Sequence, residues 1–134
     1  MIPFEFIVEG PPISAQTKNR KNLQRWKNKV RDAAIVYWPT GDAASKEQLV
    51  IRITYYFDTA SPDVDNIVKP IQDALIGLVY EDDNQITDSI SRKRDINGAY
   101  KIRGVSKVIA EGFCTGNDFL HIKVYEASGF EEVD

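Results

Sequence analysis

The residues of this chain best suited to chemistry are aspartates in its central part. Asp63 and Asp65 stand two positions apart, so in an extended segment both carboxylates would point the same way. Lys69 follows Asp65 by four positions, which places it one turn further on if a helix has begun. Asp82 and Asp83 come later on a turn-like sequence, and a helix packed back on its sheet could bring that turn near the first pair. Convergent carboxylates beside a lysine are typical of a site that binds a divalent metal ion.

Magnesium is the metal ion that this set of side chains would suit. Mg²⁺ prefers oxygen ligands in octahedral geometry and keeps several waters, so two or three carboxylates and a substrate phosphate would satisfy it. The ion would activate a water as nucleophile and stabilise charge on phosphodiester oxygens. Lys69 could stabilise the transition state or help to move a proton.

Other kinds of site are excluded by composition. The chain has a single cysteine, Cys114, and a single histidine, His121, so it cannot build a zinc site from several such ligands. No Walker A or glycine-rich dinucleotide motif is present. His121 stands in a strand-like apolar segment, and we expect it to be structural rather than catalytic.

The central aspartates also have an ordinary structural interpretation. Aspartate is a common cap at helix N-termini, a Lys69–Asp73 pair one turn apart is often a solvated surface pair, and E-D-D-N is a good turn sequence. Spacing alone therefore leaves open a non-catalytic acidic interaction module whose aspartates are caps and solubilising charges. The formal net charge of -3 and the acidic C-terminal residues favour this alternative.

Charge is distributed unevenly along the 134 residues. A negative total is atypical of a nucleic-acid binder, which usually carries a basic excess. Two basic segments, at 18–31 and 92–107, nevertheless flank the acidic centre, and their local field could attract phosphate. The residues expected to contact a phosphate backbone are Lys18, Arg20, Lys21, Arg25, Lys27, Lys29 and Arg31 in the first segment, and Arg92, Lys93 and Arg94 in the second.

The pattern of apolar residues predicts the elements that must position these side chains. Alternating or β-rich runs predict strands, and steps of three or four residues predict helices. Strands are expected at 4–8, 49–57, 85–94 and 119–125, and helices from about 22 to 36, after residue 65, and over 105–113 with Ser106 as a cap. This order favours the α+β class, with two layers and a mixed β-sheet that carries its helices on one face. We expect a single domain over residues 1–134, of which about 127–134 form a loose acidic tail.

Two local features leave boundaries open. Pro70 is comfortable only in the first turn of a helix, so either the helix begins near Lys69 or residues 65–68 form a distorted first turn. The Asn-Gly dipeptide at 97–98 is a turn signal, after which 99–103 could pair back as a hairpin.

Nothing in the sequence predicts export or membrane insertion. The opening residues, MIPFEFIVEG, lack the basic residues of a signal peptide, and no apolar run approaches the roughly 18 residues of a membrane span. A single cysteine fits a reduced intracellular compartment. We therefore expect a cytoplasmic protein without a membrane partner.

The central motif as a whole is similar to that of a known family. D-V-D-N-I-V-K-P-x-x-D-A-L followed by Y-E-D-D-N-Q-I resembles the signature of the RusA family of Holliday junction resolvases, and G-P-P-I-S-x-Q after the first strand resembles how those proteins open. The similarity covers most of the chain and is sharpest between Asp63 and Ile86. It implies a small homodimeric endonuclease that cuts a branched DNA, the four-way junction, by symmetric nicks and uses Mg²⁺ or Mn²⁺. The strand at 4–8 is one candidate edge for the dimer.

The resemblance also implies roles for the motif residues. The aspartates that hold the metal ion in the family correspond to Asp63, Asp65 and Asp83, and its essential lysine corresponds to Lys69. Asp82 is a neighbouring candidate ligand, because the segment between helix and turn varies in length within the family.

Two further motif positions would support the site. Asp73 would be a structural member of the motif, and Asn66 would brace the site. The two basic segments would hold the DNA backbone without reading bases. Residues 99–117 form a longer region than in the shortest family members, which could change how the second basic segment meets DNA. A related nuclease that prefers flaps or forks remains an alternative.

Overall fold

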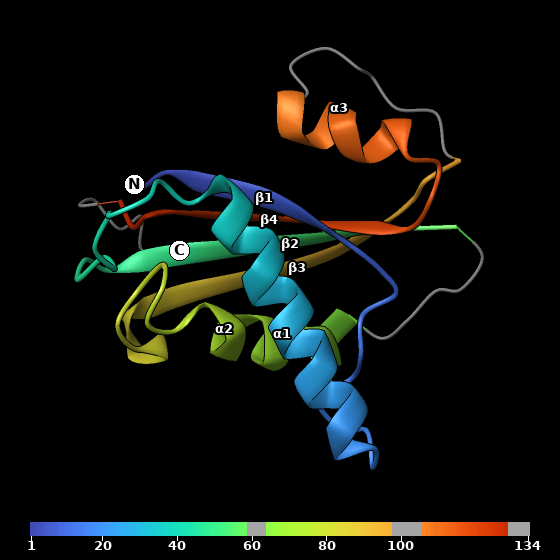
Figure 1. Cartoon of the computed structure of the whole chain (residues 1–134), viewed down its shortest axis with the longest axis horizontal. Helices are drawn as coiled ribbons and strands as arrows, with labels where there is room; N and C mark the ends of the chain where they lie inside the picture. Colours follow the sequence, from blue (N-terminus) through green and yellow to red (C-terminus); the bar gives the residue numbers. More distant parts are fainter. Residues whose placement is uncertain (59–63, 98–105, 129–134) are drawn as a thin grey trace, which may run out of the picture.

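The structure is a computed structural model that describes residues 1–58, 64–97 and 106–128. Its centre is a four-stranded sheet in the order β1-β4-β2-β3 (Figure 1). The strands are β1 (Phe4–Glu9), β2 (Leu49–Phe57), β3 (Ile86–Asp95) and β4 (Phe119–Glu126). β2 pairs with β3 in parallel, whereas β4 is antiparallel to both β1 and β2. The predicted α+β class with a mixed sheet is confirmed.

The parallel pair dictates where the central helix lies. Neighbouring parallel strands need a crossover connection that passes over one face of the sheet. Here the crossover contains the 3-10 turn η1 (Val64–Ile67), the helix α2 (Val68–Leu75) and the 3-10 turn η2 (Asp83–Gln85). The long helix α1 (Arg20–Tyr37) packs beside α2 on the same face (Figure 1).

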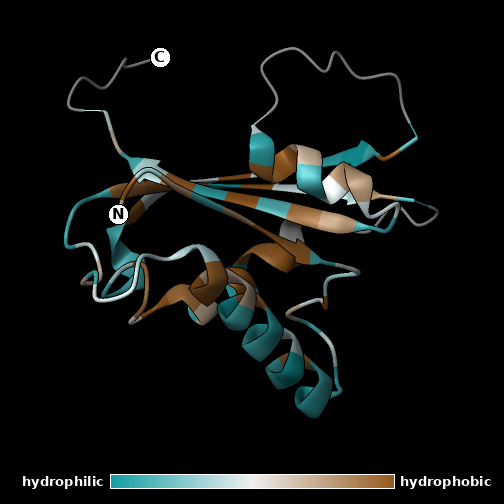
Figure 2. Ribbon diagram, turned by 45° about the horizontal axis from the view of Figure 1, so that its top comes forward, coloured by the Kyte–Doolittle hydropathy of each residue, from teal (hydrophilic) through white to brown (hydrophobic). Residues whose placement is uncertain are grey.

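Alternation along the strands builds the main core between the sheet and these two helices. Every second residue of β1, β4 and β2 points to the first face of the sheet, which is the face that α1 and α2 cover. Helix α1 contributes a stripe at steps of three and four, and α2 contributes its own apolar side. The buried core members on these elements include Phe4, Phe6, Val8, Trp26, Val30, Ala34, Ile51, Ile53, Ile71, Leu75, Leu120, Ile122 and Val124. Figure 2 shows the apolar crossover lying under the sheet, while the far end of α1 is hydrophilic and protrudes.

The helix α3 (Lys107–Cys114) packs on the opposite, second face of the sheet (Figures 1 and 2). Ser106 caps it as expected, because its hydroxyl accepts a hydrogen bond from the amide of Ile109. The helix approaches closely at Gly112, where a Cβ atom would collide with the ring of Phe119. Phe113 completes the contact by packing against Phe119 in an edge-to-face arrangement.

The expectation that all helices lie on one face is therefore corrected for α3. The physical reason is that β4 is apolar on both sides at its beginning, where Phe119 and Leu120 are both buried. A strand that is buried on both faces needs a cover on each of them. Phe119 stacks on Tyr56 of β2, and α3 closes this second, smaller apolar cluster.

The crossover settles the boundary that Pro70 left open. The backbone of 64–67 is a 3-10 turn and α2 begins at Val68, so Pro70 stands in the first turn of α2. Helix α2 therefore begins next to Lys69, as the first alternative expected, and the residues before it form a 3-10 turn, which resembles the distorted turn of the second alternative. Helix α2 ends at Leu75, because Ile76 is extended and Gly77 adopts a φ of 85°.

Two other expectations concern the ends of described segments. The expected hairpin at 99–103 lies outside the described residues, as do the last residues of the expected acidic tail. Over the described ranges, none of the helices combines the length and the apolar character that a membrane crossing requires.

Candidate active site

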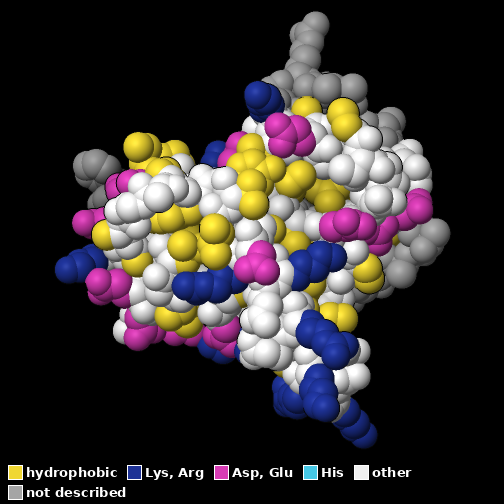
Figure 3. All heavy atoms as spheres, viewed as in Figure 1, with side chains coloured by type: hydrophobic (Ala, Val, Ile, Leu, Met, Phe, Trp, Pro, Cys, Tyr) yellow, Lys and Arg dark blue, Asp and Glu magenta, His cyan; other side chains and the backbone are white. Residues whose placement is uncertain are grey.

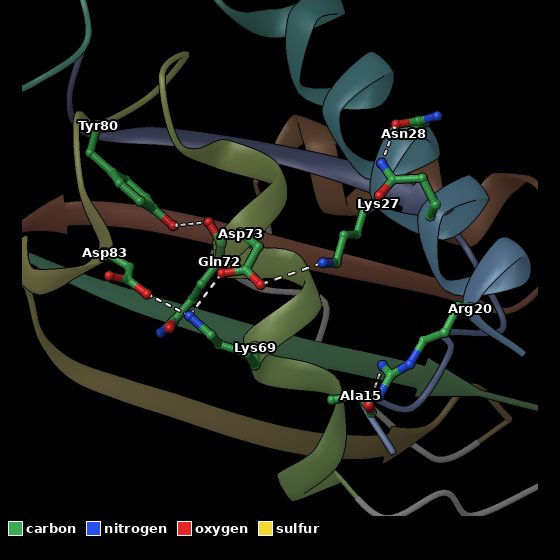
Figure 4. A network of polar contacts seen from close by, with 10 residues as sticks. Ala15, Arg20, Lys27, Asn28, Lys69, Gln72, Asp73, Tyr80 and Asp83 are labelled. Atoms are coloured by element: carbon green, nitrogen blue, oxygen red, sulfur yellow. Dashed lines mark hydrogen bonds and ion pairs between the residues drawn. The ribbon is translucent and has the colours of Figure 1, made fainter. Parts of the chain in front are cut away.

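Lys69 stands on the side of α2 that faces away from the sheet, between two aspartates (Figure 4). Its ammonium lies 2.8 Å from Oδ1 of Asp73, one turn further along the helix, and 2.6 Å from Oδ2 of Asp83 on η2. The Lys69 side chain is 59% exposed, and that of Asp83 is 33% exposed. The structure thus brings two of the expected catalytic residues, Lys69 and Asp83, into direct contact at the surface.

A capping box orders the turn that carries Asp83. Asp82 is the N-cap of η2, and its carboxylate accepts a hydrogen bond from the amide of Asn84 at 3.0 Å. The side-chain oxygen of Gln85 accepts hydrogen bonds from the amides of Glu81 and Asp82 in return. This reciprocal arrangement satisfies the free amides at the start of the turn. Asp82, the expected neighbouring metal ligand, therefore has a structural hydrogen bond in the described structure.

The turn that carries Asp83 is also tied to the body of the protein. The amide of the Gln85 side chain donates to the carbonyl oxygens of Ser45 and Glu47, both at 2.8 Å. The hydroxyl of the fully buried Tyr80 donates to the carbonyl of Gln72 on α2 at 2.6 Å (Figure 4). The turn and the helix are thus braced against each other, which holds Asp83 opposite Lys69.

Sequence reasoning did not single out Tyr80 and Gln85 for this bracing. The capping box had a signal, because D-x-x-Q at 82–85 is an N-terminal capping pattern. The hydrogen bond of Tyr80 had none, since the carbonyl that it reaches belongs to a helix eight residues earlier.

The charges in this cluster stabilise one another in their ionised forms. Hydrogen bonds to Asp73 and then to Asp83 raise the pKa of Lys69 well above its ordinary value. The hydrogen bond from Lys69 lowers the pKa of Asp83. At neutral pH the cluster therefore holds one ammonium between two carboxylates, one of which is partly open to solvent.

The first basic segment divides between protein contacts and solvent. Lys27 of α1 lies 3.5 Å from Oδ2 of Asp73, so it joins the cluster from a second helix (Figure 4). The guanidinium of Arg31 donates to the carbonyls of Ala74 and Ile76 at 3.2 and 2.8 Å, and it thereby caps the C-terminal end of α2.

The other members of this segment are exposed along the protruding part of α1 and the residues before it. They are Lys18, Arg20, Lys21, Arg25 and Lys29. Figure 3 shows Lys and Arg side chains gathered on this part of the surface. These residues are free to meet a ligand, whereas Lys27 and Arg31 already serve the packing of α1 against α2.

The second basic segment is divided by strand alternation. Arg92 and Arg94 of β3 pair in register with Thr54 and Tyr56, whose side chains point to the second face of the sheet. Lys93 lies between them and points to the first face. The three residues therefore do not form one patch.

Asp63 lies outside the described residues, and for Asp65 only the backbone is described, as part of η1. This turn leads directly into the helix that carries Lys69. The loop at 10–17 lies against it, because the amide of Ala15 donates to the carbonyl of Asn66 at 2.8 Å. The backbone thus brings residues 64–66 and the loop before α1 to the same end of α2.

One described carboxylate at this end, that of Asp83, is a suitable ligand type for a hard divalent cation. Within the ranges that the structure describes, no three His, Cys, Asp or Glu side chains are grouped to hold a metal ion. Asp83 nevertheless offers an ionised and partly exposed carboxylate. Oxygen ligands of this kind are what Mg²⁺ and Mn²⁺ accept, so Asp83 has the chemistry of one ligand for such an ion.

His121 takes no part in this site. It is 1% exposed, lies in β4, and its Nε2 is 2.7 Å from a carboxylate oxygen of Glu5 on β1. Burial lowers its pKa, and the carboxylate of Glu5 acts in the opposite direction. The expectation of a structural histidine is confirmed.

Comparison of the amino-acid sequence with known proteins identifies the family of the chain. Over 30 residues the chain is 57% identical to the uncharacterized protein YqaN of Bacillus subtilis (strain 168). That match covers 22% of this chain and 21% of YqaN, so it reaches only about a fifth of the relative's length. A sequence model of the family described as "Endodeoxyribonuclease RusA" matches residues 11–103, which is more than half of the chain and includes every residue of the Lys69 cluster. The chain therefore belongs to the RusA endodeoxyribonuclease family.

Proposed function

We propose that this protein is a magnesium-dependent endodeoxyribonuclease that resolves four-way DNA junctions by paired, symmetric nicks. The observation that carries the proposal is the position of Lys69, which a braced turn and its own helix hold between Asp83 and Asp73. Family membership supports nuclease activity on DNA. The choice of the four-way junction and of magnesium is the further step that needs an experiment.

Three aspartates would hold the metal ion: Asp63, Asp65 and Asp83, with Asp82 beside them. Support comes from the lowered pKa of Asp83 and from the backbone of η1, which leads directly into the helix that carries Lys69. A bound Mg²⁺ or Mn²⁺ would lower the pKa of water and offset charge on phosphodiester oxygens. The described cluster consists of carboxylates and an ammonium, which are compatible with binding a metal ion and a phosphate.

Lys69 would stabilise negative charge on the scissile phosphate. Its ammonium has three donor hydrogens, of which Asp73 and Asp83 use two. Its pKa is raised, so its ammonium is charged at neutral pH. A fixed positive charge that faces the developing charge of a transition state is an effective contribution to catalysis.

The exposed part of α1 would hold the DNA backbone near this cluster. Arg20 and Lys21 stand in the first turn of α1, and no acidic residue accompanies them there. The N-terminal end of a helix carries a partial positive charge, so cations at this end are unfavourable in the isolated protein. A phosphate backbone would relieve this repulsion, which supports a binding role for Lys18, Arg20, Lys21, Arg25 and Lys29.

A homodimer would explain paired nicks. Two strands of matching polarity must be cut, and a twofold dimer presents two equivalent sites to them. The strand β1 lies at an edge of the sheet, and it remains the candidate edge for such an interface.

The test is nicking of a synthetic four-way junction with Mg²⁺, with Mn²⁺ and with a chelator. We expect symmetric nicks that require the metal ion, and slower cutting of flaps and forks of matched length and salt. Equal cutting of flaps or forks would favour the related nuclease. No metal-dependent nicking of any branched DNA would favour the non-catalytic acidic module.

Lys69→Ala connects this test to the observed cluster. We expect the nicking rate to fall by about 10²–10³-fold while junction affinity changes little. Lys46→Ala is the matched control, because Lys46 is an exposed lysine that lies 4.0 Å from Glu81, close to the same turn. If the Lys46 and Lys69 variants lost activity equally, a specific role of Lys69 would be contradicted.

A further inference from the structure

A second group of cations lies on the far side of the sheet from Lys69. Arg52 of β2 is opposite Lys123 of β4 in register, and Arg92 and Arg94 follow on β3 beside Thr54 and Tyr56. Their side chains alternate with those of Ile51 and Ile53, which are buried under α1 and α2. We call the set Arg52, Arg92, Arg94 and Lys123 the arginine face.

The positive charges of the arginine face are not neutralised within the described part of the protein. No salt bridge of the described residues includes any of the four. Arg92 donates to the hydroxyl of Thr54 at 3.1 Å, and Arg94 donates to the carbonyl of Lys93 at 2.8 Å. The Nε of Arg52 is buried and has no hydrogen-bond partner.

Three strand carboxylates lie on this face of the sheet, namely Glu5, Asp88 and Glu9, which is opposite Phe119 in register. Glu5 stands opposite Lys123 in register, but its carboxylate bonds to His121 and to the hydroxyl of Ser106. Asp88, at the start of β3, accepts a hydrogen bond from the hydroxyl of Thr87. Four cations thus share the face with three anions: other groups hold Glu5 and Asp88, and Glu9 stands on β1, at the opposite edge of the sheet from Arg92 and Arg94.

Such an arrangement costs free energy in the isolated protein. Like charges on neighbouring strands repel, and partial burial together with the charges of Arg52 and Arg94 lowers the pKa of Arg92. A polyanion would remove this cost, whereas a second copy of the same face would double the repulsion. Charge complementarity therefore favours a phosphate backbone over self-association as the occupant.

The position of the face decides which DNA segment it can hold. Helix α2, which carries Lys69, is tied to the first face of β3 by the hydrogen bond between Gln72 and Ser89. A layer of sheet therefore separates Lys69 from the arginine face, and β3 is the edge strand between them (Figure 1). A straight duplex that lies on one face of the sheet does not reach the side chains of the other face. Two arms that diverge from a branch point can pass on either side of its edge.

We propose that the arginine face binds the phosphate backbone of a second duplex arm of the branched DNA whose first arm lies at Lys69. The surface there is mixed, as expected for contacts to backbone and sugar rather than base edges, since Ile90 is 39% exposed and Tyr125 is half-buried among the cations. The face would thus add affinity for branched over linear DNA. This inference rests on the proposed junction nuclease and names the part of the surface that makes the enzyme prefer a branch.

The test compares junction and linear duplex binding of Arg92→Gln/Arg94→Gln/Lys123→Gln with the wild-type protein. We expect the slope of log affinity against log salt to fall by about 2–3 for the junction, at about one unit for each lost phosphate contact, and by clearly less for linear DNA. The Lys69 cluster is intact in this variant, so the nicking that remains should still require the metal ion. The matched control is Lys46→Gln, on the other side of the molecule, and circular dichroism checks the fold.

Four other outcomes would contradict the proposal, each for a different reason. Wild-type binding and nicking that persist unchanged in the triple variant would overturn the arginine face and leave the nuclease standing. Equal losses for junction and linear duplex would show a general backbone contact and overturn the second-arm role. A dimer that dissociates in sedimentation, with affinity falling in parallel, would identify the face as a protein interface. If the wild type bound no branched DNA, the proposed function itself would fail first.

The single variant Arg94→Gln keeps the test decisive if the triple variant does not fold. Arg94 is exposed, and its described contact is to a backbone carbonyl of its own strand. We expect a decrease of about one unit in the junction salt slope. Arg94→Lys, which keeps the charge, should restore most of it, and a failure of this rescue together with normal folding would contradict a backbone contact.

Discussion

The two faces of the sheet differ in whether their cations are paired with groups of the protein. On the first face, Lys69 lies between two aspartates, Lys27 meets Asp73, and Arg31 caps α2. On the second face, the arginine face has no ion pair among the described residues. Paired charges hold a side chain in one position, which catalysis needs, while unpaired charges keep their attraction for an external polyanion.

The same contrast recurs within the first basic segment. Lys27 and Arg31 contact groups of the protein, and both lie at the base of α1 where it packs on α2. Arg20 and Lys21 stand at the exposed end, in a first turn without acidic residues. Position along the helix and the face of the helix together therefore separate the cations that contact the protein from those that are exposed, although the sequence presents them as one basic run.

The largest expected effect comes from removing a carboxylate charge on the first face, next to Lys69. Asp83→Asn should reduce nicking below detection, because it removes a carboxylate proposed to hold the metal ion and breaks the 2.6 Å ion pair with Lys69. Junction affinity should stay the same or increase, since a negative charge near phosphate is lost. Gel-shift and nicking assays measure both quantities on one substrate. Asp32→Asn, which neutralises an exposed carboxylate of α1, is the control, and loss of binding together with cleavage would contradict the metal role.

A smaller loss is expected when the position of Lys69 is disturbed but its charge remains. Asp73→Asn should slow nicking by about 10–100-fold, as for groups that orient a functional side chain. Asp73 is the strongest cause of the raised pKa of Lys69, so its removal lowers that pKa. The activity of the variant should therefore fall at a lower alkaline pH than that of the wild type. An unchanged pH–rate profile would show that Asp73 does not hold Lys69 during catalysis.

The apolar pattern predicted most of the fold because each core residue repeats with the period of its element. The strands β2 and β4 and the stripe of Trp26, Val30 and Ala34 on α1 follow directly from alternation and helical steps. The face of the sheet on which α3 packs could not be predicted from this pattern. The apolar residues on both sides of β4 do not indicate which helix covers which side. The decisive contact is the close approach of Gly112 to Phe119, which is visible only in three dimensions.

For the site, the motif predicted which residues matter but not how their charges are paired. The contact between Lys69 and Asp83 agrees with the resemblance, while Asp63 and the side chain of Asp65 lie outside the described residues. The roles of Arg31 and Lys27 depend on the angle at which α1 crosses α2, on which local sequence carries no information. The split of Arg92 and Arg94 from Lys93 did have a signal, since alternation along a predicted strand already separates neighbours.

Arg31→Ala tests whether a cation of the basic run is structural. The guanidinium makes two charged hydrogen bonds to carbonyls at the end of α2, and such bonds contribute about 1.5–3 kcal/mol each when lost from a part-buried site. We expect a loss of folding stability on that scale in urea unfolding. Junction affinity of the folded variant should change less than for an exposed cation of the same helix. A stable variant with strongly weakened DNA binding would reverse the assignment.

The smallest effect is expected for Lys29→Ala, the counterpart of Arg31→Ala on the exposed side of α1. Lys29 is exposed, so its removal should leave the unfolding midpoint in urea unchanged. If it contacts a phosphate, junction affinity should fall and the salt slope should decrease by about one unit, equally for branched and linear DNA. That equality separates α1 from the arginine face, where the loss should be greater for branched DNA. A Lys29 variant that lost affinity only for the junction would contradict this separation. Such a result would mean that α1, like the arginine face, takes part in recognising the branch and does not only bind backbone charge.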